Sequence, residues 1–172
     1  MSHLHKILKL GNSELYEISE SLKRDELPVA LERASEMHNL ILEFRNKYGA
    51  GRAIAAPQIG YKKRMIALYV DRPVVMVNPV LFNLSEEVME LWDDCMSFPG
   101  LLVKVRRHKR CSVRFKDENW KEQVWNLEDD YSELIQHEYD HLDGILATQR
   151  AIDDKSFALA EEIKNTGRQG QD

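Results

Sequence analysis

The sequence predicts an α+β domain built on antiparallel sheets, and three observations support this fold class. Apolar residues follow helical spacing over 28–48 and again over 129–143, whereas short apolar runs typical of strands fill the region between them. These strand segments follow one another without intervening helices, which favours antiparallel sheets over an alternating α/β sheet. The 172 residues match the length of one domain, so we expect a single domain over 1–172.

An N-terminal helix is predicted over 28–48. Its apolar positions at helical spacing are Ala34, Met37, Ile41, Phe44 and Tyr48. Pro28 suits the first helical turn, because a residue there needs no backbone N–H, and Gly49 suits the stop. A loop of small residues, 49–60, follows this helix.

Strands are predicted between residues 63 and 127. The segments with a strand pattern are 65–70, 74–77, 88–92, 101–105, 111–115 and 123–127. The polar residues 116–119 separate the last two segments and predict a hairpin turn.

Two further helices are predicted in the C-terminal part of the chain. The first covers 129–143, where Asp130 with Glu133 three residues later resembles a capping box in which Asp is the cap. The second covers 154–165.

Composition and charge exclude several classes of protein. No apolar run approaches the roughly 18 residues of a membrane span, and residues 1–6 show no secretory signal. With 24 Lys and Arg against 29 Asp and Glu, the formal net charge is −5, which argues against a broad nucleic-acid-binding surface. We interpret the basic run 106–110 as a solvated hairpin rather than an RNA contact.

The sharpest chemical pattern is His-Glu-Tyr-Asp-His at residues 137–141, inside a predicted helix. Residues four apart share a helical face, so His137 and His141 can reach one metal ion. Glu138 stands beside the first histidine and can accept a proton from a water on that metal. The alternative is a pair of surface histidines on an acidic helix.

A third metal ligand is not evident after this helix. Residues 142–150 contain no further His or Glu, and Asp143 would have to turn inward. The remaining soft ligands are the two cysteines, too few for a disulfide framework, so a reducing cytoplasm is the expected location. Cys111 lies in a predicted strand and fits a small buried hydrophobic residue. Cys95 lies in a loop bounded by aspartates and Pro-Gly, where burial in a core explains it less well.

The segment 51–60 forms the third constellation. Its small residues allow backbone to approach backbone or a ligand closely, and Gln58 is a lone polar amide among them. The alternative is a tight loop with an exposed glutamine.

Together these segments resemble the peptide deformylase family. Members show G-x-G-x-A-A-x-Q-x-G, then E-G-C-L-S, then Q-H-E-x-D-H-L-x-G, and the corresponding residues here are 51–60, 93–97 and 136–144. The third segment matches at every defined position, and the order and spacing of all three agree. The resemblance implies antiparallel sheets packed around a central helix that carries residues 137–141.

The resemblance also implies a set of site residues. The metal ligands that it indicates are Cys95, His137 and His141. Glu138 corresponds to the general acid/base, while the Gln58 amide and the Met96 backbone N–H correspond to the donors to the formyl oxygen. The family metal is usually Fe²⁺, with Zn²⁺, Ni²⁺ or Co²⁺ as substitutes, and a thiolate with two imidazoles suits such metals.

The implied function is metal-dependent removal of the N-formyl group from N-formyl-methionyl peptides of newly made proteins. The partner would be an N-formylated peptide, met at the ribosome, with no membrane and no sequence-specific nucleic acid involved. One alternative is a related hydrolase for a different N-formyl or acyl substrate. Another is a metal-binding homologue without turnover, although metal storage alone would need neither Glu138 nor Gln58.

The expected substrate-binding residues are Gly51, Arg52, Ala53, Asp94, Glu133 and Leu134. In this family the pocket for the first side chain is normally apolar, as methionine requires, and it draws on the residue after the first motif Gly and on the turn before the His-Glu pair. Arg52 and 130–134 make this pocket more polar than the family pattern. The chemistry is therefore expected to be retained, with an altered preference for the first side chain.

Five residues depart from the family pattern: Met96 replaces Leu at nearly equal volume, and the other four are Arg52, Ala53, Asp93 and Asp94. Arg52 and one of the two aspartates carry opposite charges in motifs that should meet at one cleft. A paired charge is less costly near a dry cleft than an isolated one, so we expect them to lie close together at its mouth. The alternative is that both charges point to solvent.

Overall fold

A computed structural model describes residues 1–163 of the chain. Its larger sheet has five antiparallel strands in the order β1-β2-β3-β6-β7. These strands are β1 (Ala53–Ala55), β2 (Met65–Tyr69), β3 (Pro73–Phe82), β6 (Arg110–Lys116) and β7 (Glu122–Glu128). The apolar middle of β2 is buried on both faces and pairs with β3, with Ile66 opposite Met76. This rigid centre supports the short strand β1 at the edge of the sheet.

The smaller sheet has three antiparallel strands in the order β4-β5-β8. These strands are β4 (Val88–Asp93), β5 (Leu101–His108) and β8 (Phe157–Leu159). The turn between β4 and β5, residues 94–100, carries one of the predicted metal ligands.

The expected helix over 154–165 is wrong in its first part. Residues 157–159 form β8 instead, because they pair with the free edge of β5, where Leu101 faces Leu159 and Val103 faces Phe157. Helical structure starts only at α3 (Ala160–Ile163). The last two residues of the expected helix, 164 and 165, lie outside the described residues.

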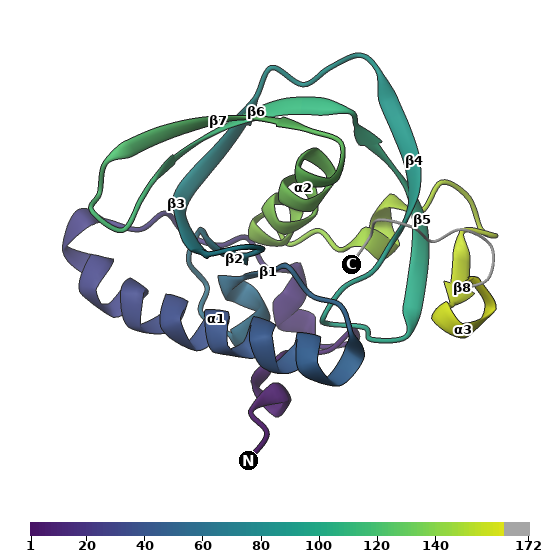
Figure 1. Cartoon of the computed structure of the whole chain (residues 1–172), viewed down its shortest axis with the longest axis horizontal. Coiled ribbons are helices and arrows are strands. Elements are labelled where there is room, and N and C mark those ends of the chain that lie inside the picture. Colours follow the sequence, from purple (N-terminus) through teal and green to yellow (C-terminus); the bar gives the residue numbers. More distant parts are fainter. Residues whose placement is uncertain (164–172) are drawn as a thin grey trace.

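Two long helices pack against the sheets. Helix α1 (Leu27–Tyr48) has Pro28 in its first turn and ends at Gly49, whose left-handed φ of +75° allows its N–H to donate to the Arg45 carbonyl. Its buried face is formed by Ala30, Ala34, Met37, Leu40, Ile41 and Phe44. Figure 1 shows α1 along the outside of the molecule, next to β1 and β2.

Helix α2 (Asp130–Leu142) runs through the middle of the fold, with the strands curving around it (Figure 1). The capping box expected from Asp130 and Glu133 is not formed. The N-cap is Asp129, at a φ of +53°, and its carboxylate binds Lys109 instead of a helix N–H. The Glu133 carboxylate is likewise engaged elsewhere, by Arg52.

Short 3₁₀ helices connect the remaining segments. They are Leu4–Lys6, Ser13–Tyr16, Arg24–Glu26, Ala56–Ile59 and Ala147–Arg150.

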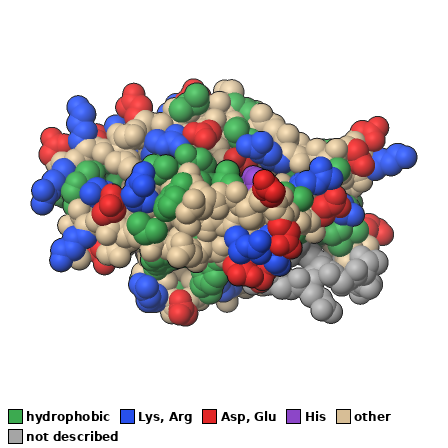
Figure 2. Space-filling model, turned by 90° about the horizontal axis from the view of Figure 1, so that it is seen from above, with side chains coloured by type: hydrophobic (Ala, Val, Ile, Leu, Met, Phe, Trp, Pro, Cys, Tyr) green, Lys and Arg blue, Asp and Glu red, His purple; other side chains and the backbone are tan. Residues whose placement is uncertain are grey.

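Two antiparallel sheets around the buried helix α2 confirm the predicted α+β fold class. Among the described residues, no helix is long and apolar enough to cross a membrane. Figure 2 shows basic and acidic side chains intermixed on one face, rather than a continuous basic surface there.

Candidate metal and active site

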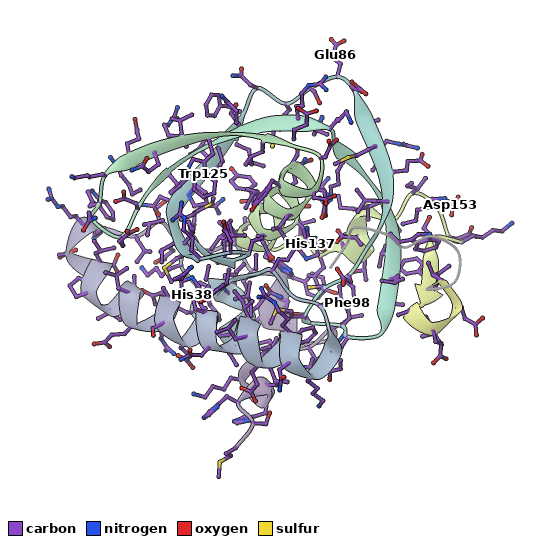
Figure 3. The ribbon with its side chains drawn as sticks, viewed as in Figure 1. His38, Glu86, Phe98, Trp125, His137 and Asp153 are labelled. Carbon is purple, nitrogen blue, oxygen red and sulfur yellow. The ribbon has the colours of Figure 1, made fainter. Side chains whose placement is uncertain are left out.

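Three buried side chains meet at the centre of the molecule. The ligand atoms of Cys95, His137 and His141 all lie within 4.8 Å of one another. The thiol comes from the turn after β4, and both imidazoles come from α2, where residues four apart share one face. In Figure 3, His137 projects from α2 at the middle of the fold. The structure therefore brings together the predicted ligand set, and the alternative of two surface histidines is wrong.

The chemistry of these donors fits a divalent transition metal. The Nδ1 atom of His137 lies 2.8 Å from an Asp93 carboxylate oxygen, which fixes the ring and leaves Nε2 for a metal. The Cys95 sulfur lies 3.4 Å from Nε2 of His141. One thiolate and two imidazoles suit Fe²⁺, Zn²⁺, Co²⁺ or Ni²⁺, and three protein ligands leave a position open for a reactant.

Glu138 is buried beside this cluster with one oxygen unsatisfied. Its Oε1 has no hydrogen-bond partner within residues 1–163. A buried, unpaired carboxylate oxygen is costly, so its persistence points to a partner supplied by a ligand or a reactant. Burial raises the pKa of Glu138 to about 7, although the neighbouring His137 opposes this shift. Such a pKa suits a group that accepts and returns a proton near neutral pH.

The two histidines have opposite electrostatic environments. Burial alone would lower the pKa of His137, but Asp93 and Cys95 together outweigh it and raise that pKa well above the usual value. Burial and the adjacent His137 lower the pKa of His141 well below the usual value. Asp93 also acts on His141, where it opposes the lowering, but His137 is the ligand in hydrogen-bond contact with Asp93, and this contact favours a proton on Nδ1 of His137.

Asp93 belongs to a buried chain of charges behind the metal cluster. Arg107 donates from Nη2 to Asp93 at 3.2 Å and from Nη1 to Asp140 at 2.7 Å. Arg150 donates to both oxygens of Asp140, at 3.2 and 3.0 Å. The side chain of Arg107 is only 4% exposed, so interpreting 106–110 as a fully solvated hairpin was wrong at this position.

Sequence reasoning missed the functional place of Arg107, Asp140 and Arg150. Asp140 stands at the defined Asp of Q-H-E-x-D-H, which was an available signal. Arg107 lies outside the family motifs, so no motif pointed to it. Its side chain faces inward because side chains alternate along β5, and Arg106 beside it faces outward.

Gln58 is held with its amide oriented towards the same cluster. Its Oε1 accepts from the Ala55 N–H at 2.9 Å, and its Nε2 donates to the Ser97 hydroxyl at 2.9 Å and lies 3.5 Å from the Cys95 sulfur. The 3₁₀ helix Ala56–Ile59 places it there, and it is buried. The alternative of an exposed glutamine in a tight loop is therefore wrong.

A cleft with a volume of about 190 Å³ opens beside this cluster. The predicted site residues that line it are Gly51, Arg52, Ala53, Gln58, Asp94, Cys95, Met96, Glu133, Leu134, His137 and Glu138. Apolar lining also comes from Phe44, Tyr48 and Leu102. The lining thus comes from α1, the segment leading into β1, the β4–β5 turn with its flanking residues, and α2.

Arg52 forms an ion pair inside this cleft. Its Nη2 donates to Oε1 of Glu133 at 2.7 Å, and the two side chains are only 14% and 6% exposed. Of the two aspartates expected near Arg52, Asp93 is held by Arg107 and His137, and the hydrogen-bonded partner of Arg52 is Glu133. Asp94 lies near enough for its charge to act on Arg52, and the alternative that Arg52 points to solvent is wrong.

A family model described as Polypeptide deformylase matches residues 4–157 of this chain. The chain belongs to the peptide deformylase family. Peptide deformylase 1 of Prochlorococcus marinus (strain MIT 9313) is 33% identical over 176 residues, covering 94% of this chain and 88% of that protein. Peptide deformylase of Leptospira biflexa is 30% identical, covering 96% and 97%.

Solved deformylase structures share the fold of this deformylase. An actinonin-bound class I type b peptide deformylase from Acinetobacter baumannii has a TM-score of 0.77 at 31% identity, covering 84% of this chain and 96% of that one. A Met-Ala-Ser-bound structure of the same protein has a TM-score of 0.76 at 29% identity, with the same coverage. This chain is thus a metallohydrolase of the deformylase type, with a Cys/His/His cluster as its metal site.

Proposed function

We propose that this deformylase hydrolyses the N-formyl group of formylated peptides, with Glu138 transferring the proton and Gln58 and Met96 holding the formyl oxygen. The observation that supports this mechanism best is the juxtaposition of Glu138, whose oxygen is buried and unpaired, with the Cys/His/His cluster in one cleft. A metal held by Cys95, His137 and His141 would supply an activated water and polarise the carbonyl group.

Glu138 takes the role of proton carrier. With a pKa raised to about 7 by burial, the ionised carboxylate accepts a proton from the attacking water. The protonated acid then returns this proton to the leaving amine, so formate and a free amino terminus result. Water and amide are consumed and both products are accounted for, with no further reactant.

Gln58 and Met96 take the role of oxyanion donors. The contact from the Ala55 N–H fixes the Gln58 oxygen and so directs the Nε2 hydrogens towards the cluster. Met96 follows Cys95 directly, so its backbone N–H lies in the same turn. Donors that are oriented before the reaction stabilise the developing negative charge without reorganisation.

Fe²⁺ is the metal that we propose for this site, with Zn²⁺, Ni²⁺ or Co²⁺ as substitutes. A buried thiolate ligand supports these borderline metals over Mg²⁺ or Ca²⁺, which prefer oxygen ligands. A free thiol and a ferrous ion both need a reducing compartment, which supports a cytoplasmic location.

The deciding experiment is formate release from formyl-Met-Ala-Ser and from other formylated tripeptides, with Fe²⁺-loaded protein under anaerobic conditions. Formate release that depends on the metal supports the proposal. Stoichiometric metal binding without formate from any formylated amine contradicts it and favours a metal-binding homologue.

A further inference from the structure

The cleft beside the metal cluster is lined by a buried ion pair. A peptide with an apolar first side chain, such as methionine, would need apolar surface at this position. The Arg52–Glu133 contact of 2.7 Å joins two side chains that are almost fully removed from solvent. Burying a charge pair is costly, and the cost rises when a ligand excludes the remaining water. A thioether in contact with this pair would remove that water and return no hydrogen bond.

The Arg52–Glu133 pair lies about one helical turn from the metal cluster. Glu133 precedes His137 by four residues on α2, so the two side chains share one helical face about 5–6 Å apart at their Cβ atoms. Arg52 directly precedes β1, whose last residue, Ala55, holds Gln58 in place. Because Arg52, Glu133 and Glu138 line one cleft, a formyl group at the cluster would place the first side chain of the peptide near Arg52 and Glu133.

Negative charge dominates around this wall. Arg52 is the positive group, and the carboxylates that act on it are those of Glu133, Asp94 and Asp130. Only Oε1 of Glu133 accepts from Arg52, and the other oxygen, Oε2, has no hydrogen-bond partner among the described residues. Because Glu133 lines the cleft, this oxygen can accept a hydrogen bond from a ligand bound there.

We propose that the cleft selects formylated peptides whose first side chain ends in a hydrogen-bond donor, an amide or an ammonium, over methionine. This proposal rests on the proposed deformylase function and names its substrate class. A glutamine side chain is close to methionine in length, and its amide can donate to Glu133 while its oxygen accepts from Arg52. A lysine ammonium can donate to Glu133, whereas a glutamate side chain would meet like charges from Glu133 and Asp94.

The experiment compares kcat/KM of the metal-loaded full chain for formyl-Xaa-Ala-Ser, with Met, Gln, Lys or Glu as the first residue. We expect formyl-Gln and formyl-Lys to exceed formyl-Met about tenfold or more, and formyl-Glu to be the poorest. The double variant Arg52→Ile with Glu133→Ile replaces the pair by apolar surface and should reverse the order in favour of methionine. A parent preference of less than tenfold, or an unchanged order in the double variant, overturns the proposal.

Two controls separate specificity from folding. Arg106→Ile with Glu90→Ile removes an ion pair of 2.8 Å that lies on exposed, opposed strand positions outside the cleft, and should leave the order unchanged. Glu133→Gln preserves the size of the side chain and removes its charge, so the formyl-Lys to formyl-Gln ratio should fall. A ratio that stays the same contradicts the role of Glu133.

Binding of the unformylated products tests the pocket without turnover. By calorimetry, Gln-Ala-Ser should bind about tenfold more tightly than Met-Ala-Ser. If no peptide releases formate but Gln-Ala-Ser still binds more tightly, the proposed function is contradicted and the pocket preference is not. If formate is released but Met-Ala-Ser binds more tightly, the proposed substrate class is contradicted and the deformylase function is not.

Discussion

At the scale of single residues, Glu138 stands out because its buried carboxylate has an oxygen without a hydrogen-bond partner among the described residues. Its unpaired oxygen and raised pKa make sense if a proton moves there during each turnover. We predict that Glu138→Gln keeps the metal, because all three ligands remain, and lowers kcat by about 10²–10⁴-fold. Formate release and metal content of the same preparation measure both parts. Near-parental activity would remove Glu138 from the mechanism.

The two cysteines are a matched pair for testing the ligand assignment. Both are buried, but Cys95 lies at the cluster, whereas Cys111 packs in β6 with its sulfur 3.4 Å from the Ser132 hydroxyl. Burial raises the pKa of the Cys111 thiol, which disfavours the thiolate that a metal needs.

We predict that Cys95→Ser loses bound metal, since a hydroxyl is a harder and poorer ligand than a thiolate. Cys111→Ser should retain one metal per chain and lose only stability. Metal analysis after anaerobic gel filtration reports both. Metal loss in the Cys111 variant with retention in the Cys95 variant would mean that the motif was aligned wrongly.

Residue identity could be predicted from the motifs, but charge partners could not. The sequence placed Arg52 and two aspartates near one cleft, yet it could not say which carboxylate the guanidinium meets. Asp93 ends β4 and turns towards α2 and Arg107, while Glu133 comes from a helical face opposite Arg52. Such choices depend on side-chain directions across elements far apart in the sequence, which local spacing does not encode.

At the scale of elements, one buried arginine connects β5, β4 and α2. Arg107 bridges Asp93 at the end of β4 and Asp140 on α2, and Asp93 in turn holds His137. The sheet is thereby linked to the metal helix through a charge pair that is shielded from water. Removing Arg107 takes one cationic partner from each of two buried carboxylates, leaving Asp93 with His137 and Asp140 with Arg150.

We predict that Arg107→Leu lowers the free energy of unfolding by about 3–5 kcal/mol, because two buried carboxylates each lose their most deeply buried cationic partner. Its neighbour Arg106 has a side chain that is 52% exposed, so Arg106→Leu is the matched control and should cost about 0–1 kcal/mol. Urea unfolding of both variants measures the difference. Equal midpoints would show that the buried arginine carries no net structural role.

Long elements were predictable and short ones were not. The helical pattern over 28–48 and the apolar runs of β2 and β6 contain enough residues to define a period. Strand β8 has three residues, and its conformation follows from the open edge of β5 rather than from its own pattern. The inward turn of Arg107 belongs to the same class, because its partners lie on other elements.

At the scale of the whole molecule, the site draws its metal ligands from two separate parts of the fold. Cys95 lies in the turn between two strands of the three-stranded sheet. The histidines belong to helix α2, which packs against the five-stranded sheet. The family motifs predicted this assembly, since three segments that are far apart in sequence have to meet for one chemistry. A metal at this point would join the two parts, and it would stabilise the folded chain because the three ligands are brought together by folding.

Removing the metal should therefore lower the thermal stability of the whole chain. A ligand present at about 100 times its Kd stabilises the native state by about 2.7 kcal/mol. For a chain of this size about 1 kcal/mol shifts Tm by about 2–4 °C, so we predict that the metal-loaded protein melts about 5–10 °C above the metal-free protein. Anaerobic calorimetry before and after chelation measures this difference.

The two cysteine variants are the controls for this Tm difference. Cys95→Ser should abolish the difference while Cys111→Ser preserves it, because Cys95 is the cysteine that would join the β4–β5 turn to the histidines of α2 through the metal. Equal Tm values for the loaded and metal-free parent would show that the two parts are held together without the metal.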